Sequence, residues 1–188
     1  MQIDGVILAG GKSTRMGRNK SQIKLNGKNL INHVFDRLNP QVSQIWVSTN
    51  VYLNQFPKTI QFKDKLEKSF GPLTGIYSGL KQAQTNWVQF CPNDAPFLPE
   101  NLVSTLKKNI KKDKVQIVIP RVEGFLEPTF ILCSKSLVDD IPKFIKKENP
   151  KLQDWVRNYN YHFVDFDNKK EFINVNSQNE LELIQNEQ

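Results

Sequence analysis

The chain has 188 residues, enough for one domain with its own core, and no apolar run approaches the roughly 20 residues that span a bilayer, so we expect no membrane segment. The formal net charge is +7, but the lysines recur at helical spacing with apolar residues between them, which favours water-facing helix surfaces over a nucleic-acid site. Two cysteines, Cys91 and Cys133, are too few for a disulfide framework, so we expect a protein of the reducing cytoplasm.

Apolar runs alternate with amphipathic segments along the first two thirds of the chain. Helical periodicity covers residues 29–38, 73–84 and 100–110, and short buried strands are predicted at residues 3–8, 44–48, 59–62, 87–91 and 116–119. This alternation predicts a mostly parallel central sheet with helices on both faces, a three-layer α/β/α Rossmann-like fold. Such sheets bind ligands beyond the carboxyl ends of their strands.

After residue 120 the pattern is less regular. Residues 121–127 and 128–133 predict a hairpin that turns near Gly124, and helices are expected at residues 134–147 and 152–159. Residues 161–166 alternate as a strand does, and residues 172–175 predict another short strand. Residues 177–186 predict a closing helix with Ser177 as its N-cap.

Two adjacent glycines follow the first predicted strand and open a basic loop. A Walker A motif has four residues between its first glycine and its Gly-Lys-Ser, whereas here five residues separate Gly5 from the Gly-Lys-Ser that begins at Gly11. The dinucleotide fingerprint Gly-x-Gly-x-x-Gly is also absent, because Gly10 and Gly11 are adjacent. The turn at Gly10 and Gly11 exposes backbone N–H groups that suit phosphate oxygens. Arg15 adds forked donors and Lys20 a compact charge. The loop therefore predicts a polyphosphate site.

An aspartate follows the predicted strand at residues 87–91. Asp94 is held between prolines in the sequence Cys-Pro-Asn-Asp-Ala-Pro, just beyond that strand. Taken alone, Asp94 is adequately explained by an Asx-turn before the next helix. With a phosphate loop at the same sheet edge, a Mg²⁺ site becomes the better interpretation, because Mg²⁺ takes one or two carboxylates together with substrate phosphates.

These motifs resemble a known family. The sequence Leu-Ala-Gly-Gly-Lys-Ser-Thr-Arg-Met-Gly at residues 8–17, then Lys20 and Leu-Asn-Gly-Lys at 25–28, is similar to the opening signature of nucleotidyltransferases with a GT-A-type fold, and more narrowly of the molybdenum cofactor guanylyltransferases. The resemblance implies transfer of GMP from GTP to molybdopterin-bound molybdenum cofactor, with release of pyrophosphate. It implies catalytic roles for Arg15, Lys20 and Asp94, with Asp94 as the Mg²⁺ ligand. It also implies transient contacts with molybdenum cofactor biosynthesis proteins or acceptor molybdoenzymes.

The resemblance also assigns a nucleotide pocket. Its expected residues are Leu8, Ala9, Gly10, Gly11, Lys20, Asn50, Asp64, Gly71 and Asp94. As a hypothesis, the Asp64 carboxylate reads guanine, because it can accept from N1–H and N2–H, a donor pair that cytosine lacks. Without the resemblance, Asp64 would be interpreted as an exposed loop residue.

We expect a single domain, in which about residues 1–120 form the nucleotide-binding part and about residues 121–188 form the acceptor part. The acceptor substrate is therefore expected at the C-terminal third of the chain. Asn174 and Asn176 resemble the Asn-x-Asn-Thr segment of the family. Further acceptor-side candidates are Glu127, Arg121 and Arg157. Asn19 departs from the family pattern, which often has aspartate there, and this departure bears on catalytic efficiency.

Two alternatives stay open from the sequence. One is a cytidylyltransferase acting on molybdopterin or another small phosphate, which preference for CTP over GTP would reveal. The other is a non-catalytic nucleotide-binding regulatory protein, which would release no pyrophosphate.

Overall fold

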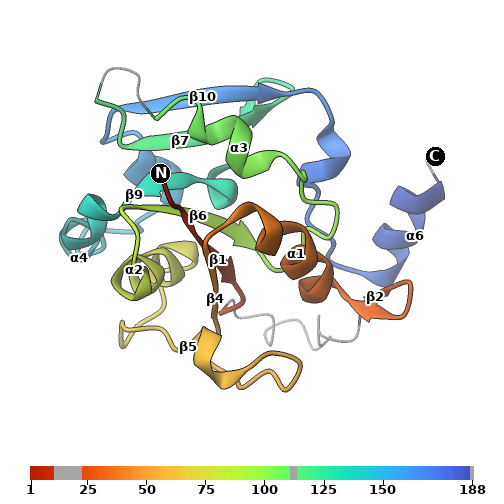
Figure 1. The fold of residues 1–188 in the computed structure, drawn as a ribbon. Helices are drawn as coiled ribbons and strands as arrows, with labels where there is room; N and C mark the ends of the chain where they lie inside the picture. The colour runs from red at the N-terminus through yellow and green to blue at the C-terminus, as the bar shows by residue number, and fades with distance from the viewer. Residues whose placement is uncertain (11–22, 111–113, 187–188) are drawn as a thin grey trace.

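One central sheet organises the molecule. The computed structural model describes residues 1–10, 23–110 and 114–186 (Figure 1). Within these residues the strands lie in the order β10-β7-β9-β6-β1-β4-β5, with β8 beside β7. The strands are β1 (Asp4–Leu8), β4 (Gln44–Ser48), β5 (Gln61–Phe62), β6 (Trp87–Pro92), β7 (Ile117–Val122), β8 (Phe125–Leu126), β9 (Leu132–Ser134) and β10 (Tyr161–Phe166).

The sheet is mostly parallel, as the sequence predicts. β1 pairs in parallel with β4 and β6, β4 with β5, and β7 with β10. The short strands β8 and β9 run the other way: β8 pairs antiparallel with β7, and β9 lies antiparallel between β6 and β7. The carboxyl ends of β1, β4, β6 and β7 therefore share one edge of the sheet.

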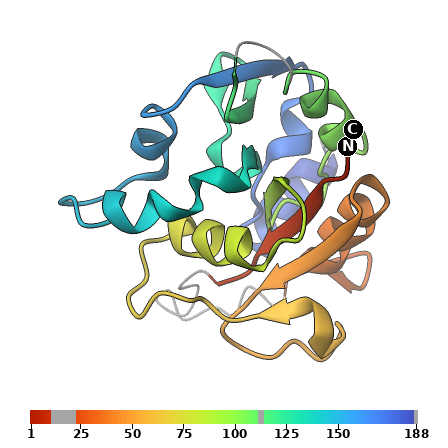
Figure 2. The ribbon, with the colours of Figure 1, turned by 60° about the vertical axis from the view of Figure 1, so that its left-hand side comes forward.

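Helices cover both faces, which completes the predicted three layers (Figures 1 and 2). Along β1, Val6 and Ile7 point into different cores because successive strand side chains alternate. Ile7 packs with α1 (Leu30–Leu38) and α3 (Leu102–Lys107). Val6 packs with α2 (Pro72–Gln82), α4 (Ile141–Phe144) and α5 (Leu152–Val156). None of the described helices is long and apolar enough to cross a membrane.

Helix α2 lies close to the sheet because two of its glycines face it. A Cβ at Gly75 would come within 2.7 Å of Leu8 Cδ2. A Cβ at Gly79 would come within 2.7 Å of the Phe90 ring and 3.1 Å of a Val6 methyl group. Phe90 and Val6 are fully buried, whereas Leu8 is half-buried.

We expect Gly79→Ala to lower the free energy of unfolding by up to about 2 kcal/mol. The overpacking cost of about 1–3 kcal/mol exceeds the gain in helix propensity of about 1 kcal/mol, because the Phe90 ring has no room to move. Urea unfolding measures the change. Gly75→Ala is the matched comparison and should cost less, since the end of the Leu8 side chain can rotate away. Equal losses in the two variants would contradict this account.

The C-terminal third differs in part from the sequence prediction. The hairpin turn is confirmed: Glu123 and Gly124 have φ of 49° and 83° between β7 and β8. Residues 134–147 are not one helix but a 3-10 helix, η6 (Lys135–Asp139), followed by α4. The predicted strand at residues 172–175 is wrong, because η7 (Lys169–Phe172) is a 3-10 helix and the segment after it pairs with a loop instead of a strand.

The remaining short elements connect this frame. They are the 3-10 helices η3 (Asn39–Gln41), η4 (Lys58–Ile60) and η5 (Pro128–Phe130), the hairpin strands β2 (Lys24–Leu25) and β3 (Lys28–Asn29), and the closing helix α6 (Gln178–Asn186). The hairpin turns at Asn26 and Gly27, which have φ of 51° and 75°, as a two-residue type I′ turn requires.

Helix α6 packs on the β2–β3 hairpin away from the two main cores. Six buried apolar residues form this third core: Ile23, Leu25, Leu30, Val175, Leu181 and Ile184. The predicted N-cap is confirmed, because Ser177 Oγ accepts a hydrogen bond from Glu180 N–H at 3.1 Å. Glu180 in turn accepts from the backbone N–H of Asn176 at 2.6 Å, an arrangement similar to a capping box.

Candidate active site

The carboxyl ends of β1, β4 and β6 bring the predicted nucleotide residues to one edge of the sheet. Leu8 is in register with Ser48 of β4 and with Pro92 of β6. Ala9 N–H continues the ladder by donating to the Ser48 carbonyl at 2.8 Å. Two residues beyond these paired positions come Gly10 after β1, Asn50 after β4 and Asp94 after β6. The three residues therefore lie just past the ends of adjacent strands.

Asp64 is fixed at this edge by two donors. Asn50 Nδ2 donates to Asp64 Oδ2 at 2.8 Å, and Asn50 Oδ1 accepts from Asp64 N–H at 3.2 Å. The buried Ser48 hydroxyl donates to Asp64 Oδ1 at 3.2 Å. Each carboxylate oxygen has a further lone pair, so a fixed Asp64 can still accept from a ligand.

Gly10 lies directly against this carboxylate. A Cβ at Gly10 would be 3.1 Å from Asp64 Oδ2 and 3.7 Å from Asn50 Nδ2. Only a residue without a side chain leaves the carboxylate uncovered here. The structure thus brings Gly10, Asn50 and Asp64 together as predicted, and it adds Ser48, which the sequence prediction missed. The signal for Ser48 was its place as the last residue of the predicted strand at residues 44–48.

Gly71 begins α2 in a backbone conformation that favours glycine, with φ of 62° and ψ of −140°. The loop between Asp64 and Gly71 is fastened to the first turns of α2. Phe70 N–H donates to Thr74 Oγ1 at 2.7 Å, and Lys65 N–H donates to Ser78 Oγ at 2.8 Å. Gly71 therefore stands at the exposed start of α2, at the end of a tethered loop.

Asp94 is half-buried after β6, and the C-terminal asparagines lie beside it. The Asp94 carbonyl accepts a hydrogen bond from Val175 N–H at 2.7 Å, which carries Asn174 and Asn176 to the Asp94 segment. Asn176 Nδ2 also donates to the Asn174 carbonyl at 3.3 Å. This proximity of residues far apart in the sequence agrees with the prediction that the segment around Asn174 borders the site.

The described residues contain no group of three or more His, Cys, Asp or Glu side chains that could hold a metal ion. The buried Cys91 and Cys133 thiols are free, and burial raises their pKa. A cation at Asp94 would therefore complete its coordination with substrate phosphates and water. The half-buried carboxylate of Asp94 fits that mode, which is the usual one for Mg²⁺.

Of the other acceptor-side candidates, Arg121 and Glu127 lie on one hairpin and Arg157 lies apart from them. On the β7–β8 hairpin, Arg121 donates to both oxygens of Asp165 at 2.6 and 2.8 Å and stacks 3.7 Å over the Phe163 ring. The Arg121 hydrogen bonds hold the pKa of Asp165 below its usual range. Glu127 lies on the same hairpin, and partial burial raises its pKa. Arg157 follows α5 near the amino end of β10, where it pairs with Asp154 at 3.8 Å, so the structure does not bring it to the carboxyl edge.

Gly11, Arg15, Asn19 and Lys20 lie outside the described residues. The predicted roles of Gly11, Arg15 and Lys20 in phosphate binding stay predictions.

A family model for the MobA-like NTP transferase domain matches residues 5–163. The chain belongs to this family. Curated relatives named molybdenum cofactor guanylyltransferase include one from Aliivibrio fischeri strain MJ11, 36% identical over 184 residues that cover 96% of this chain and 94% of the relative. Another, from Yersinia pseudotuberculosis serotype O:1b, is 37% identical over 185 residues that cover 96% of this chain and 94% of the relative.

Among solved structures, molybdopterin-guanine dinucleotide biosynthesis protein A of Archaeoglobus fulgidus superposes with a TM-score of 0.79. It is 22% identical, and the match covers 97% of each chain. This likeness supports the fold. Together with the family match, it confirms the GT-A-type nucleotidyltransferase fold and the family resemblance read from residues 8–28. As a MobA-like NTP transferase, the chain is a nucleotidyltransferase.

Proposed function

We propose that this MobA-like protein transfers GMP from GTP to molybdopterin-bound molybdenum cofactor, forming the guanine dinucleotide cofactor and releasing pyrophosphate. The names of its relatives support the reaction. The single structural observation that carries the nucleotide assignment is the Asp64 carboxylate, held by Ser48 and Asn50 against Gly10. Its place beyond β1 and β4 is where open parallel sheets bind ligands.

In this proposal Asp64 recognises the guanine base. Asn50 and Ser48 each donate to one carboxylate oxygen and so fix its orientation before the base arrives. Guanine then supplies N1–H and N2–H to the same carboxylate, a pair of charge-assisted hydrogen bonds. Cytosine offers no such pair of adjacent donors. Gly71, at the exposed start of α2, borders the base and ribose.

The chemistry requires positioning and charge stabilisation more than proton transfer. A terminal phosphate oxygen of molybdopterin forms the new bond to the α-phosphorus of GTP, and the bond to pyrophosphate breaks. The attacking oxygen is already anionic, so no general base is needed. Arg15 and Lys20 stabilise the charge on the α-phosphate and the leaving group. Asp94 would hold Mg²⁺, which supplies Lewis-acid stabilisation of phosphate oxygens when bound.

The acceptor side is proposed for the C-terminal part of the domain. Asn174 and Asn176 are supported by the hydrogen bond from Val175 N–H to the Asp94 carbonyl, beside the residue proposed to hold Mg²⁺. Arg121, in β7, and Glu127, just after β8, belong to one hairpin, and β7 ends at the same sheet edge. Arg157 is retained from the resemblance alone. Cytoplasmic location and transient contact with cofactor biosynthesis proteins or acceptor molybdoenzymes belong to the same proposal.

Pyrophosphate release tests this function directly. The purified chain is incubated with Mg²⁺ and GTP, CTP or ATP, with and without molybdopterin carrying molybdenum. We expect release that requires the acceptor and prefers GTP over CTP by at least about a hundredfold in kcat/KM. Preference for CTP would instead favour the cytidylyltransferase. Nucleotide binding without any release would favour the regulatory protein.

A further inference from the structure

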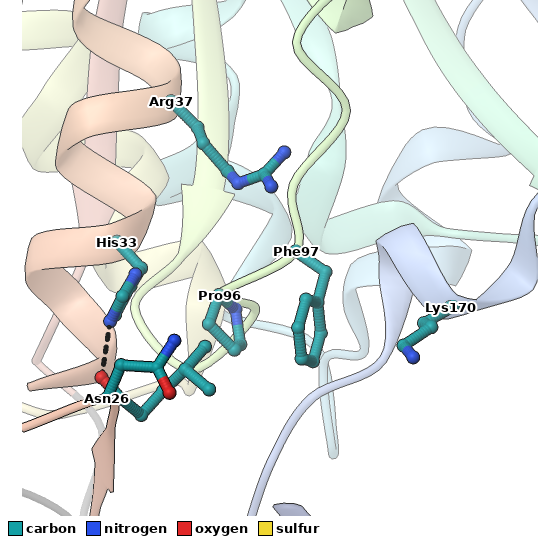
Figure 3. Close-up of a pocket in the computed structure, with 7 residues that line it drawn as sticks. Asn26, His33, Arg37, Pro96, Phe97 and Lys170 are labelled. Atoms are coloured by element: carbon teal, nitrogen blue, oxygen red, sulfur yellow. Dashed lines mark hydrogen bonds between the residues drawn. The ribbon is translucent and has the colours of Figure 1, made fainter. Parts of the chain in front are cut away.

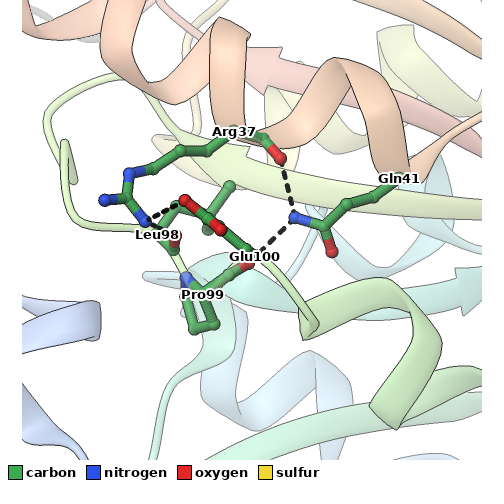
Figure 4. A network of polar contacts seen from close by, with 5 residues as sticks. All are labelled: Arg37, Gln41, Leu98, Pro99 and Glu100. Carbon is green, nitrogen blue, oxygen red and sulfur yellow. Dashed lines mark hydrogen bonds and ion pairs between the residues drawn. The ribbon is translucent and has the colours of Figure 1, made fainter.

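The two carboxylates of the candidate site are each supported by a helix, and the two helices lie on opposite faces of the sheet. On the α1 side, Arg37 Nη1 donates to the Leu98 carbonyl at 3.1 Å, and Gln41 Nε2 donates to the Pro99 carbonyl at 2.8 Å (Figure 4). These bonds reach the chain four and five residues beyond Asp94. They hold the segment that carries this carboxylate as a whole.

A cavity of about 280 Å³ adjoins the same segment (Figure 3). Pro96 and Phe97, which closely follow Asp94, line it together with Arg37. Lys170 Nζ is 5.5 Å from the centroid of the Phe97 ring, so an ammonium group already covers that ring. These side chains therefore stabilise the Asp94 segment by packing against it.

Asp64 is supported more directly, from the α2 side. Ser78, in the middle of α2, is fully buried. Its hydroxyl donates to the Thr74 carbonyl one turn earlier at 2.8 Å and accepts from Lys65 N–H, also at 2.8 Å. Lys65 directly follows Asp64, and within the described residues no backbone carbonyl accepts from its N–H. The Ser78 hydroxyl therefore takes the place of a backbone partner for the peptide group next to Asp64.

The two peptide groups that flank the Asp64 Cα are held from different elements. Asp64 N–H donates to Asn50 Oδ1 at 3.2 Å, and Lys65 N–H donates to Ser78. Because each peptide group is planar, only the φ and ψ torsions of Asp64 relate the two groups. With both groups held, the backbone sets the direction of the Asp64 Cα–Cβ bond. Ser48 and Asn50 then fix the end of the side chain.

Helix α2 can act as a rigid support because it lies in close contact with β4. A Cβ at Gly75 would be 3.5 Å from Ser48 Oγ, and Ser78 lies about one turn further along the helix. Ser48, which donates to the Asp64 carboxylate, and Ser78, which holds the backbone beside it, thus belong to one packed unit. A binding group must be held to within about 0.5 Å of its productive position, and packed helices and strands can provide that precision.

We propose that Ser78 is a positioning residue for guanine recognition. Through Lys65 N–H it sets the direction of the Asp64 carboxylate, so that the carboxylate meets guanine N1–H and N2–H together. Without this bond Ser48 and Asn50 still hold the carboxylate, but at a shifted position. GTP then binds less well, whereas CTP, which presents the same phosphates but does not use Asp64, is unaffected. The inference rests on the recognition of guanine by Asp64 proposed above.

Binding of Mg²⁺·GTP and Mg²⁺·CTP without acceptor, measured by isothermal titration calorimetry, tests the role of Ser78. We expect Ser78→Ala to raise Kd for GTP by about three- to tenfold, the range of one ordinary hydrogen bond, and to leave Kd for CTP within about twofold. The matched control is Ser104→Ala. Ser104 Oγ donates to the Asn101 carbonyl at 2.9 Å, but it lies on α3 at the other face of the sheet, and its loss should change neither Kd.

A double variant shows whether Ser78 acts through Asp64. In an Asp64→Asn background, Ser78→Ala should change Kd for GTP by less than about twofold, because no carboxylate is left to position. Equal losses in the two backgrounds would overturn the inference. Ser78→Cys is a second variant that keeps the buried site filled, and since sulfur is a weak acceptor it should show the same selective loss. Urea unfolding establishes that each variant compared is folded.

The binding readout separates this inference from the transfer reaction. If Ser78→Ala weakens GTP and CTP alike, or weakens neither, the inference is overturned while GMP transfer stands. If the parent releases no pyrophosphate but Ser78→Ala selectively weakens GTP binding, the transfer reaction is wrong and the inference stands. A parent that binds CTP as tightly as GTP would overturn guanine recognition and the inference together.

Discussion

Asp94→Asn should lower kcat for pyrophosphate release by at least about a hundredfold. Removing one charge that stabilises a transition state typically costs a factor of about 10²–10³, and here the lost carboxylate is the proposed Mg²⁺ ligand. The fold should be kept, because the bond from Val175 goes to the Asp94 backbone carbonyl, which the amide variant retains. Steady-state kinetics at saturating GTP and varied Mg²⁺ measure the effect.

The matched control is Asp139→Asn, which makes the same chemical change in an exposed side chain that pairs with Lys81 in the last turn of α2. It should leave kcat unchanged, and both variants should unfold at the same urea concentration as the parent. Near-normal turnover of Asp94→Asn would reject the metal assignment. A loss of activity accompanied by an equal loss of stability would point to a structural role instead.

Asp64→Asn should reduce the preference for GTP over CTP. The amide can no longer accept from both guanine N1–H and N2–H, and hydrogen bonds to a charged group are worth about 1.5–3 kcal/mol. That range corresponds to a fall of about 10- to 150-fold in kcat/KM for GTP, with little change for CTP. Competition between the two nucleotides for the variant and the parent gives the ratio.

Ser48→Ala separates recognition from positioning in the same pocket. It removes one donor to Asp64 but leaves the carboxylate and the contacts of Asn50. We expect KM for GTP to rise severalfold with kcat nearly unchanged, a much smaller effect than that of Asp64→Asn.

Unchanged GTP selectivity in Asp64→Asn would contradict the role proposed for Asp64 and would show that the base is read by other groups.

Local sequence signals predicted the frame of this fold well. The bounds of β4 and β10 agree with the predicted residues 44–48 and 161–166, because strand periodicity and flanking polar residues mark both ends. Ser177 was found by capping chemistry alone. The prediction failed at residues 172–175, where an apolar run resembles a strand but Val175 pairs with the Asp94 carbonyl. Such a partner is set by tertiary packing, which local periodicity does not contain.

The sequence predicted which residues belong to the site better than it predicted the contacts that hold them in place. Strand ends located Gly10 and Asp94, since parallel strands place their carboxyl ends together, whereas Asn50 came from the resemblance. The resemblance, and not the residues alone, supplied Asp64. The role of Ser48 depends on a hydrogen bond between segments 16 residues apart, so only the fold could reveal it.

The core beneath α6 and the bond from Val175 to Asp94 have a consequence for synthesis on the ribosome. Leu25 and Leu30 are made before most of the sheet, but their buried partners Leu181 and Ile184 are made only after its last strand, β10. Contacts between such distant segments form late and expose apolar surface until they do. The nascent chain can thus assemble its sheet before α6 covers Leu25 and Leu30, and the asparagines proposed for the acceptor side reach Asp94 only once the segment after β10 has been made.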